Sequence, residues 1–179
     1  MDNTEKILNE IDQIKFKDYI PEEFYYLPHN VVTALKRKNL SITAAESLTS
    51  GMFQSTVSQV PGASQVFSGG FVTYSDDVKS KLLGIDPKLI EENTVVSAPV
   101  AKAMAQQAAR VLHADIGVGL TGVAGPDALE GSPVGTVFIG VSNSLSNNVR
   151  VKEFHFSGDR NSIRLKSVVA AFVLVEEII

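Results

Sequence analysis

A regular alternation of helix and strand patterns from residue 29 onward most constrains the fold of this chain. Short apolar or β-branched runs alternate with segments whose apolar residues recur at helical spacing. The expected strands are 42–45, 68–74, 116–120, 134–141 and 149–156, and the expected helices are 29–38, 50–59, 76–83, 98–111 and 163–175. This order predicts an α/β protein, a layered α/β/α sandwich with helices on both faces of a mixed β-sheet.

A further helical segment precedes this alternation. Its apolar residues recur at helical spacing among acidic ones, at positions 7, 8, 11 and 14, and aromatic residues follow at 24–26. We interpret residues 1–26 as an N-terminal helical appendage and residues 27–179 as the α/β domain. Because the apolar face of the appendage has no obvious place in the α/β core, we expect it to dock on the domain or on a second subunit. We also expect a homo-oligomer.

Composition excludes several classes of function. A chain of 179 residues is long enough for one domain with a substantial core. The formal net charge of −4 gives no footprint for nucleic acid. The absence of cysteine rules out disulfides and thiolate chemistry, and the three histidines lack metal-ligand spacing, so we expect no metal site. Without a run of ~18 apolar residues or a signal peptide, the sequence predicts a cytoplasmic protein with no membrane partner.

A polar turn between the first strand and the following helix is the main candidate for chemistry. It runs from Ala45 to Gly51 and contains Glu46, Ser47 and Thr49. Such a turn exposes hydroxyls and unpaired backbone N–H groups at a helix N-terminus, where anions and developing oxyanions are stabilised. Ser47 is therefore either a nucleophile or only a helix cap.

Two glycine-containing segments could approach this turn. Thr121-Gly122-Val123-Ala124-Gly125-Pro126 follows a buried strand directly, at the strand's carboxyl end, where ligands bind in open α/β sheets. Its two glycines permit a nest of N–H groups suited to a phosphate or ribose, although a turn without a ligand would look the same. In the strand 68–74, Gly69 and Gly70 would let a backbone or a ligand approach closely.

Together these segments resemble a known protein family. The matching motifs are Ala45-Glu46-Ser47, Gly69 to Ser75 with Lys79, Thr121 to Pro126, Pro133 to Val137 and Phe156 to Arg160. In this order they resemble the CinA C-terminal domain family, which includes nicotinamide-nucleotide amidases, over residues 28 to 178. This sequence departs from the family pattern at Leu48, usually cysteine, and at Ser50, usually glycine.

The resemblance implies hydrolysis of the carboxamide of nicotinamide mononucleotide (NMN), a step of pyridine-nucleotide recycling. The products would be nicotinate mononucleotide and ammonia, with no cofactor. Ser47, Tyr74 and Lys79 match the catalytic residues of a Ser/Lys/Tyr hydrolase. Lys79 would be the base, which requires its pKa to fall several units from about 10.4, and Tyr74 would relay a proton or orient Lys79.

Each of these residues also has an ordinary interpretation. Lys79 could belong to a solvated helix face, and Tyr74 could lie at the edge of the core with a wet hydroxyl. Glu46 could hold Lys79, accept a substrate hydroxyl or cap a backbone N–H. Arg160 and Arg164 could bind the NMN phosphate or bridge Asp159 or a neighbouring subunit.

The substrate-binding residues implied by the resemblance surround the candidate nucleophile. They are Glu46, Thr49, Gly51, Gly70, Thr121, Gly122, Gly125, Arg160 and Arg164. Two other functions stay open at this point. One is a nucleotide-binding or protein-interaction module that has lost catalysis, favoured by the departures at Leu48 and Ser50. The other is amide hydrolysis on a different pyridine nucleotide.

Overall fold

A five-stranded mixed β-sheet forms the middle layer of the computed structural model, which describes residues 3–16 and 18–179. The strand order is β2-β1-β3-β4-β5. The strands are β1 (Ile42–Glu46), β2 (Phe71–Val72), β3 (Ile116–Gly122), β4 (Thr136–Asn143) and β5 (Asn148–His155). β1 pairs in parallel with β2 and β3, whereas β4 is antiparallel to both of its neighbours. The predicted mixed sheet is confirmed.

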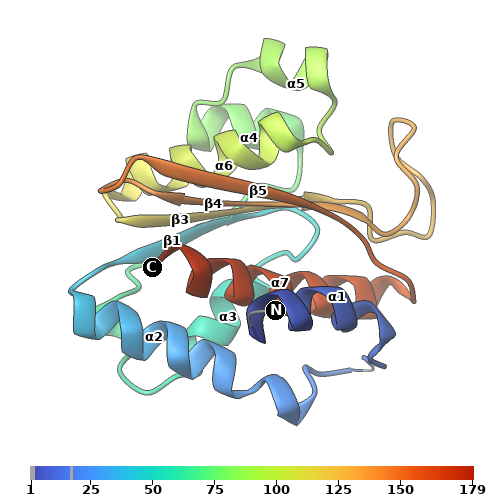
Figure 1. Cartoon of the computed structure of the whole chain (residues 1–179). Coiled ribbons are helices and arrows are strands. Elements are labelled where there is room, and N and C mark those ends of the chain that lie inside the picture. The colour runs from blue at the N-terminus through green and yellow to red at the C-terminus, as the bar shows by residue number, and fades with distance from the viewer. Residues whose placement is uncertain (1–2, 17) are drawn as a thin grey trace.

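Helices cover both faces of this sheet, as Figure 1 shows. On one face lie α4 (Asp76–Leu83), α5 (Pro87–Asn93) and α6 (Ala98–Leu112). On the other lie α1 (Asn3–Glu10), α2 (Tyr26–Lys38), α3 (Met52–Ser58) and α7 (Arg160–Ile178). Short 3₁₀ helices occupy Ile11–Gln13, Glu22–Phe24 and Ala63–Gln65. The α/β/α sandwich is confirmed, with α5 as an element that the sequence analysis missed.

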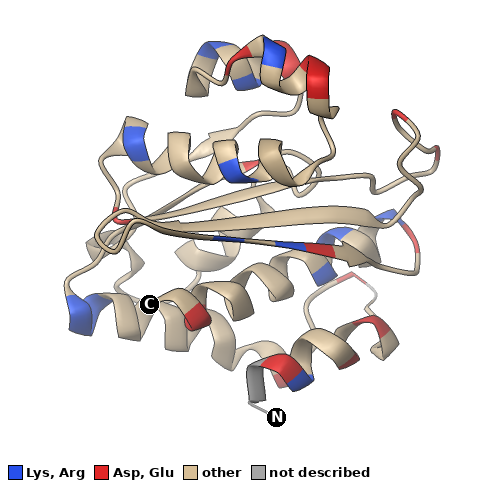
Figure 2. Cartoon of the chain, turned by 45° about the horizontal axis from the view of Figure 1, so that its top comes forward, with Lys and Arg blue, Asp and Glu red and all other residues tan. Residues whose placement is uncertain are grey.

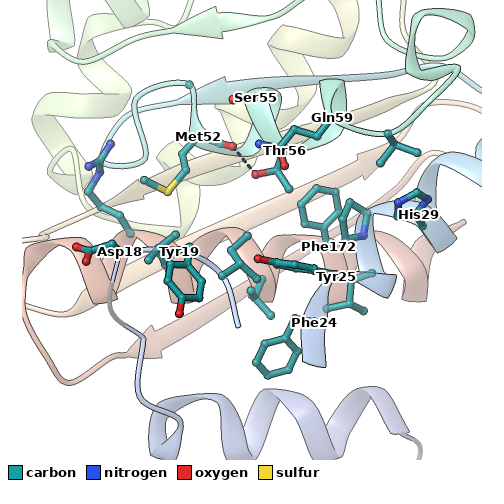
Figure 3. A pocket seen from close by; sticks show the side chains of 18 of the residues that line it. Asp18, Tyr19, Phe24, Tyr25, His29, Met52, Ser55, Thr56, Gln59 and Phe172 are labelled. Carbon is teal, nitrogen blue, oxygen red and sulfur yellow. Dashed lines mark hydrogen bonds between the residues drawn. The ribbon is translucent and has the colours of Figure 1, made fainter. Parts of the chain in front are cut away.

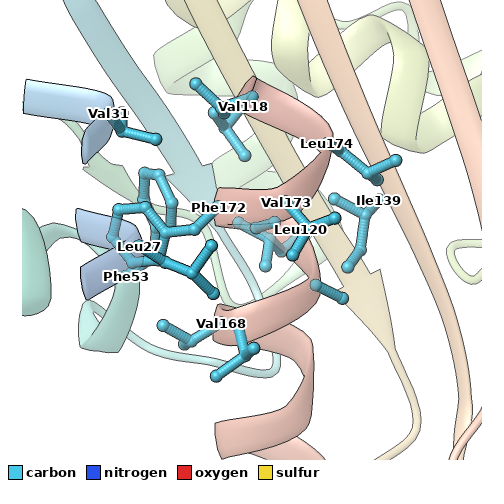
Figure 4. Packing of buried hydrophobic residues seen from close by; sticks show 14 of the residues in the cluster. Leu27, Val31, Phe53, Val118, Leu120, Ile139, Val168, Phe172, Val173 and Leu174 are labelled. Atoms are coloured by element: carbon cyan, nitrogen blue, oxygen red, sulfur yellow. The ribbon is translucent and has the colours of Figure 1, made fainter. Parts of the chain in front are cut away.

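The larger part of the core lies between the sheet and α7. This helix is buried nearly all round because it packs on the sheet with one face and on α2 and α3 with others (Figure 4). The rings of Phe53 and Phe172 meet at a centroid distance of 4.6 Å. On the opposite face, a Cβ at Gly117 or Gly119 would collide with backbone oxygens of α6, so glycine lets this helix sit close to β3.

The N-terminal segment packs on α7 of its own chain. Leu8, Ile11 and Phe16 are buried in the same hydrophobic core as α7. The Asp12 carboxylate accepts hydrogen bonds from Lys166 Nζ at 2.8 Å and from the Ser157 N–H at 2.7 Å. Residues 1, 2 and 17 of the predicted appendage lie outside the described residues. Of the two docking surfaces expected for this segment, the structure shows contact with the chain's own domain.

Positive backbone φ angles set several element boundaries. The expected strand 68–74 is reduced to Phe71–Val72 at the sheet edge, after Gly69 with φ 154°. β4 begins only after Gly135, with φ 92°. Helix α3 begins after Ser50 and Gly51, which are both left-handed, at φ 51° and 92°. Within residues 3–16 and 18–179, every helix is too short or too polar to span a lipid bilayer.

Candidate active site

The turn between β1 and α3 lies at the carboxyl ends of the parallel strands. The Ser47 N–H donates to the Leu120 carbonyl of β3 at 2.9 Å, and the Ser50 N–H donates to the Ser47 carbonyl at 3.1 Å. Two successive left-handed residues, Ser50 and Gly51, then direct the chain into α3. The turn therefore presents Ser47 at the sheet edge where open α/β folds bind ligands.

Glu46 caps the helix that follows the turn. Its fully buried carboxylate accepts hydrogen bonds from the backbone N–H groups of Gly51, Phe53 and Gln54 at 2.9–3.1 Å, and from Gln54 Nε2 at 3.0 Å. A carboxylate at a helix N-terminus satisfies orphan donors and complements the helix dipole. Of the three interpretations of Glu46, the structure thus shows the backbone cap, which fixes the residue next to Ser47.

Lys79 lies on the buried face of α4 and contacts Ser47. Its side chain is fully buried, and Nζ lies 3.3 Å from Ser47 Oγ and 2.9 Å from the Thr73 carbonyl oxygen. The neighbouring Lys81 is exposed and paired with Asp77, so only this second lysine belongs to a solvated helix face. The structure therefore brings the predicted nucleophile and base within hydrogen-bonding distance.

Burial of Lys79 disfavours its charged form. Burial lowers the pKa of the Lys79 ammonium below its ordinary value of 10.5, while the carboxylates of Asp76 and Glu130 act in the opposite direction. Asp76 Oδ1 lies 3.9 Å from Nζ, but the Asp76 side chain is half exposed and its field is partly screened. A lysine held in this way can accept a proton from a hydroxyl.

Tyr74 and Arg160 form one wall beside this pair. Arg160 Nη2 donates to the Tyr74 hydroxyl at 2.8 Å, and Nη1 donates to the Gly125 carbonyl at 2.6 Å. The Tyr74 side chain is 57% exposed, so it lies at the edge of the core. Its hydroxyl contacts Arg160 and not Lys79. Arg160 thereby joins the segment after β2 to the glycine-containing loop after β3.

These groups surround a cavity of about 370 Å³. Of the predicted site residues, the cavity is lined by Ser47, Tyr74, Thr121, Gly122, Gly125 and Arg160. Thr121 Oγ1 donates to the Val95 carbonyl at 2.8 Å, which ties β3 to the segment before α6. The sequence analysis missed Asp76, Asp127 and Glu130, which also line the cavity. Asp127 and Glu130 lie in the loop that directly follows the Thr121–Pro126 motif, and their acidic character there was a sequence signal that could have identified them.

The remaining predicted residues lie outside this cavity. Arg164 Nε and Nη2 donate to the Leu48 and Thr49 carbonyls at 3.0 and 3.1 Å, so Arg164 holds the turn from behind. Thr49 is fully buried within that turn. A Cβ at Gly70 would collide with the Ala44 carbonyl and the Gln54 side chain, so the close approach at Gly70 is made by protein and not by a ligand.

A second cavity, of about 610 Å³, lies behind the turn. Figure 3 shows its walls, where Met52 and Thr56 of α3 and the following Gln59 face Tyr19, Tyr25 and Phe172. Gly51 and Arg164 line this cavity, whereas Ser47 and Lys79 do not. Of the two residues, Ser47 lines the smaller cavity, and Lys79 contacts Ser47 without lining either cavity.

The left-handed conformation of Ser50 leads to a stability prediction. Left-handed φ costs a residue with a Cβ about 1 kcal/mol, and glycine avoids this cost. We expect Ser50→Gly to raise the free energy of unfolding by about 0.5–1 kcal/mol in urea denaturation. The control is Ser58→Gly at the end of α3, where helical glycine should lower stability by a similar amount. A lower stability of Ser50→Gly would contradict the argument.

The fold and the site define an α/β/α sandwich with a buried Ser–Lys pair at the carboxyl ends of its parallel strands. The family model of the CinA C-terminal domain matches residues 25–179, and the chain belongs to this family.

Two curated relatives are competence-damage inducible proteins. That of Streptococcus agalactiae is 48% identical over 180 residues, covering 98% of this chain and 43% of the relative. That of Pediococcus pentosaceus is 47% identical over 166 residues, covering 93% and 37%. The chain thus spans less than half the length of these relatives.

Solved structures of CinA-related proteins have the same fold. A competence/damage inducible protein from Agrobacterium tumefaciens superposes with a TM-score of 0.85 at 29% identity, covering 90% of this chain and 99% of that one. A CinA superfamily protein from Escherichia coli also gives 0.85, at 27% identity, covering 99% and 98%.

Proposed function

We propose that this protein hydrolyses the carboxamide of NMN to nicotinate mononucleotide and ammonia. The observation that carries the proposal is the buried Lys79 Nζ, 3.3 Å from Ser47 Oγ at the edge of a ligand-sized cavity. A serine hydroxyl becomes a nucleophile only when a base removes its proton, and a lysine with a lowered pKa can do so. The resemblance of the site motifs to nicotinamide-nucleotide amidases supplies the substrate.

In the first half of the reaction, Ser47 Oγ attacks the carboxamide carbon and its proton passes to Lys79. The tetrahedral intermediate carries an oxyanion, which needs N–H donors. The Leu48 N–H is a candidate donor, because Leu48 follows the nucleophile and lines the cavity. Collapse of the intermediate breaks the C–N bond. Lys79 then gives its proton to the departing nitrogen, which leaves as ammonia.

In the second half, a water molecule attacks the resulting ester while Lys79 again accepts a proton. Nicotinate mononucleotide is released and the Ser47 hydroxyl is restored. Arg160, which lines the same cavity, has the charge and planar geometry to bind the substrate phosphate. Tyr74 contacts Arg160 in this structure, so in the proposal it orients that guanidinium. Proton relay by Tyr74 stays a prediction.

Ammonia release from NMN by the purified protein, without added metal, tests the proposal. We expect one nicotinate mononucleotide per ammonia, and much slower release from free nicotinamide, which has no phosphate for Arg160. Binding of NMN in calorimetry without any release would instead favour the module that has lost catalysis. Ammonia release from another pyridine nucleotide, but not from NMN, would identify that nucleotide as the substrate in place of NMN.

A further inference from the structure

Acidic side chains and one arginine line the cavity beside Ser47. Three carboxylates and one guanidinium line it, those of Asp76, Asp127, Glu130 and Arg160. Asp76 lies 3.9 Å from Lys79 Nζ, and Glu130 also acts electrostatically on Lys79. Arg160 instead contacts Tyr74 and Gly125. Two of the carboxylates, those of Asp76 and Glu130, therefore act on Lys79, while the guanidinium is bound to the segments after β2 and β3.

Glu130 is an exposed residue whose carboxylate is anchored by a backbone hydrogen bond. It belongs to the loop between β3 and β4, which projects beyond the end of the sheet (Figures 1 and 2). Glu130 Oε2 accepts a hydrogen bond from the Val95 N–H at 2.8 Å. Thr121 donates to the Val95 carbonyl, so hydrogen bonds hold both the N–H and the carbonyl of Val95. Val95 and Val96 supply apolar surface to the same cavity, suited to the face of a flat ring.

We propose that Glu130 and Asp76 select the cationic pyridinium ring of the substrate over an uncharged ring. This inference rests on the proposed function and names the charge that the same site recognises. In NMN the carboxamide is attached to a ring with a permanent positive charge, and the phosphate is anionic. A carboxamide at Ser47 puts the ring beside the two carboxylates, while the phosphate points toward Arg160.

The same charges also act on the product. Hydrolysis replaces a neutral carboxamide with a carboxylate close to Asp76 and Glu130. Like charges at close range repel, so the product is bound less tightly than the substrate. The ring keeps its positive charge throughout the reaction, so its attraction stabilises the bound substrate and the transition state alike. Through the ring charge, Glu130 therefore acts on binding of the substrate, and its effect on the base Lys79 is separate.

The test compares NMN with reduced NMN, in which the ring is uncharged and the phosphate is unchanged. Both ligands are titrated by calorimetry into Ser47→Ala, which prevents turnover, with and without Glu130→Gln or Asp76→Asn. Gln can still accept the bond from Val95. We expect each substitution to weaken NMN binding about fivefold and to leave reduced NMN within twofold. The control is Glu10→Gln on α1, an equal charge change away from the cavity.

If Glu130→Gln and Asp76→Asn leave the ratio of NMN affinity to reduced-NMN affinity unchanged, the inference is overturned. This includes an equal loss of affinity for both ligands, which would indicate a structural role. A second readout is the pH dependence of kcat/KM in the Ser47-containing protein. Because Glu130 raises the pKa of Lys79, Glu130→Gln should move the rising limb to lower pH. Failure of the proposed function gives a different result. The protein would then still bind NMN more tightly than reduced NMN, but it would release no ammonia.

Discussion

Replacing Ser47 with alanine should lower ammonia release from NMN at least about a thousandfold, equivalent to about 4 kcal/mol of transition-state free energy. Without Oγ, no serine oxygen is left beside Lys79 to attack the carboxamide. NMN binding should persist within about threefold, because Arg160 and the walls of the cavity are intact. Steady-state ammonia release and calorimetry measure the two quantities.

The control for this substitution is Ser55→Ala, an exposed serine of α3 on the side of the second cavity. It should leave kcat/KM unchanged. Acid quenching of the unaltered protein during turnover, followed by intact mass measurement, should reveal the ester of nicotinate mononucleotide on Ser47. Turnover by Ser47→Ala at the rate of the unaltered protein would refute the nucleophile assignment and leave Lys79 as the base for a water molecule.

Local signals in the sequence defined most of the elements. The predicted helix 76–83 has the observed bounds of α4. In the structure Ser75 caps its start and Gly84 ends it in the left-handed region. Asn39 ends α2 in the same way. Helix α5 was missed although Asp86 caps it and Pro87 occupies its first turn. Its seven residues are too few for a clear helical period.

The site depended on contacts that no local pattern contains. The sequence alone does not distinguish the four charged residues of α4, which are Asp76, Asp77, Lys79 and Lys81. Lys79 is buried because α4 packs against the turn. Arg160 and Arg164 lie one helical turn apart, but one reaches the cavity and the other reaches the carbonyls behind Ser47. Glu130 meets Val95 across 35 positions. Chemistry-bearing residues could therefore be named from the sequence, but their partners could not.

Replacing Lys79 with methionine should abolish deamidation as completely as the loss of Ser47, since the hydroxyl then has no base. The fold should survive, because methionine fills similar volume without a buried charge. The control is Lys81→Met, two positions after Lys79 on α4. It removes an exposed lysine that is paired with Asp77, and it should leave kcat/KM unchanged. Substantial turnover by Lys79→Met would exclude Lys79 as the base.

The pH dependence tests the same assignment through stability. Lys79 must be neutral to act as a base, so kcat/KM should rise with pH with a midpoint below 10.5, because burial lowers this pKa. Between the lowered pKa and 10.5 the unfolded state binds more protons, so the free energy of unfolding rises with pH there. Below this window the buried ammonium carries its full penalty. Lys79→Met should therefore exceed the unaltered protein in stability most at low pH, and that advantage should shrink as the pH approaches 10.5.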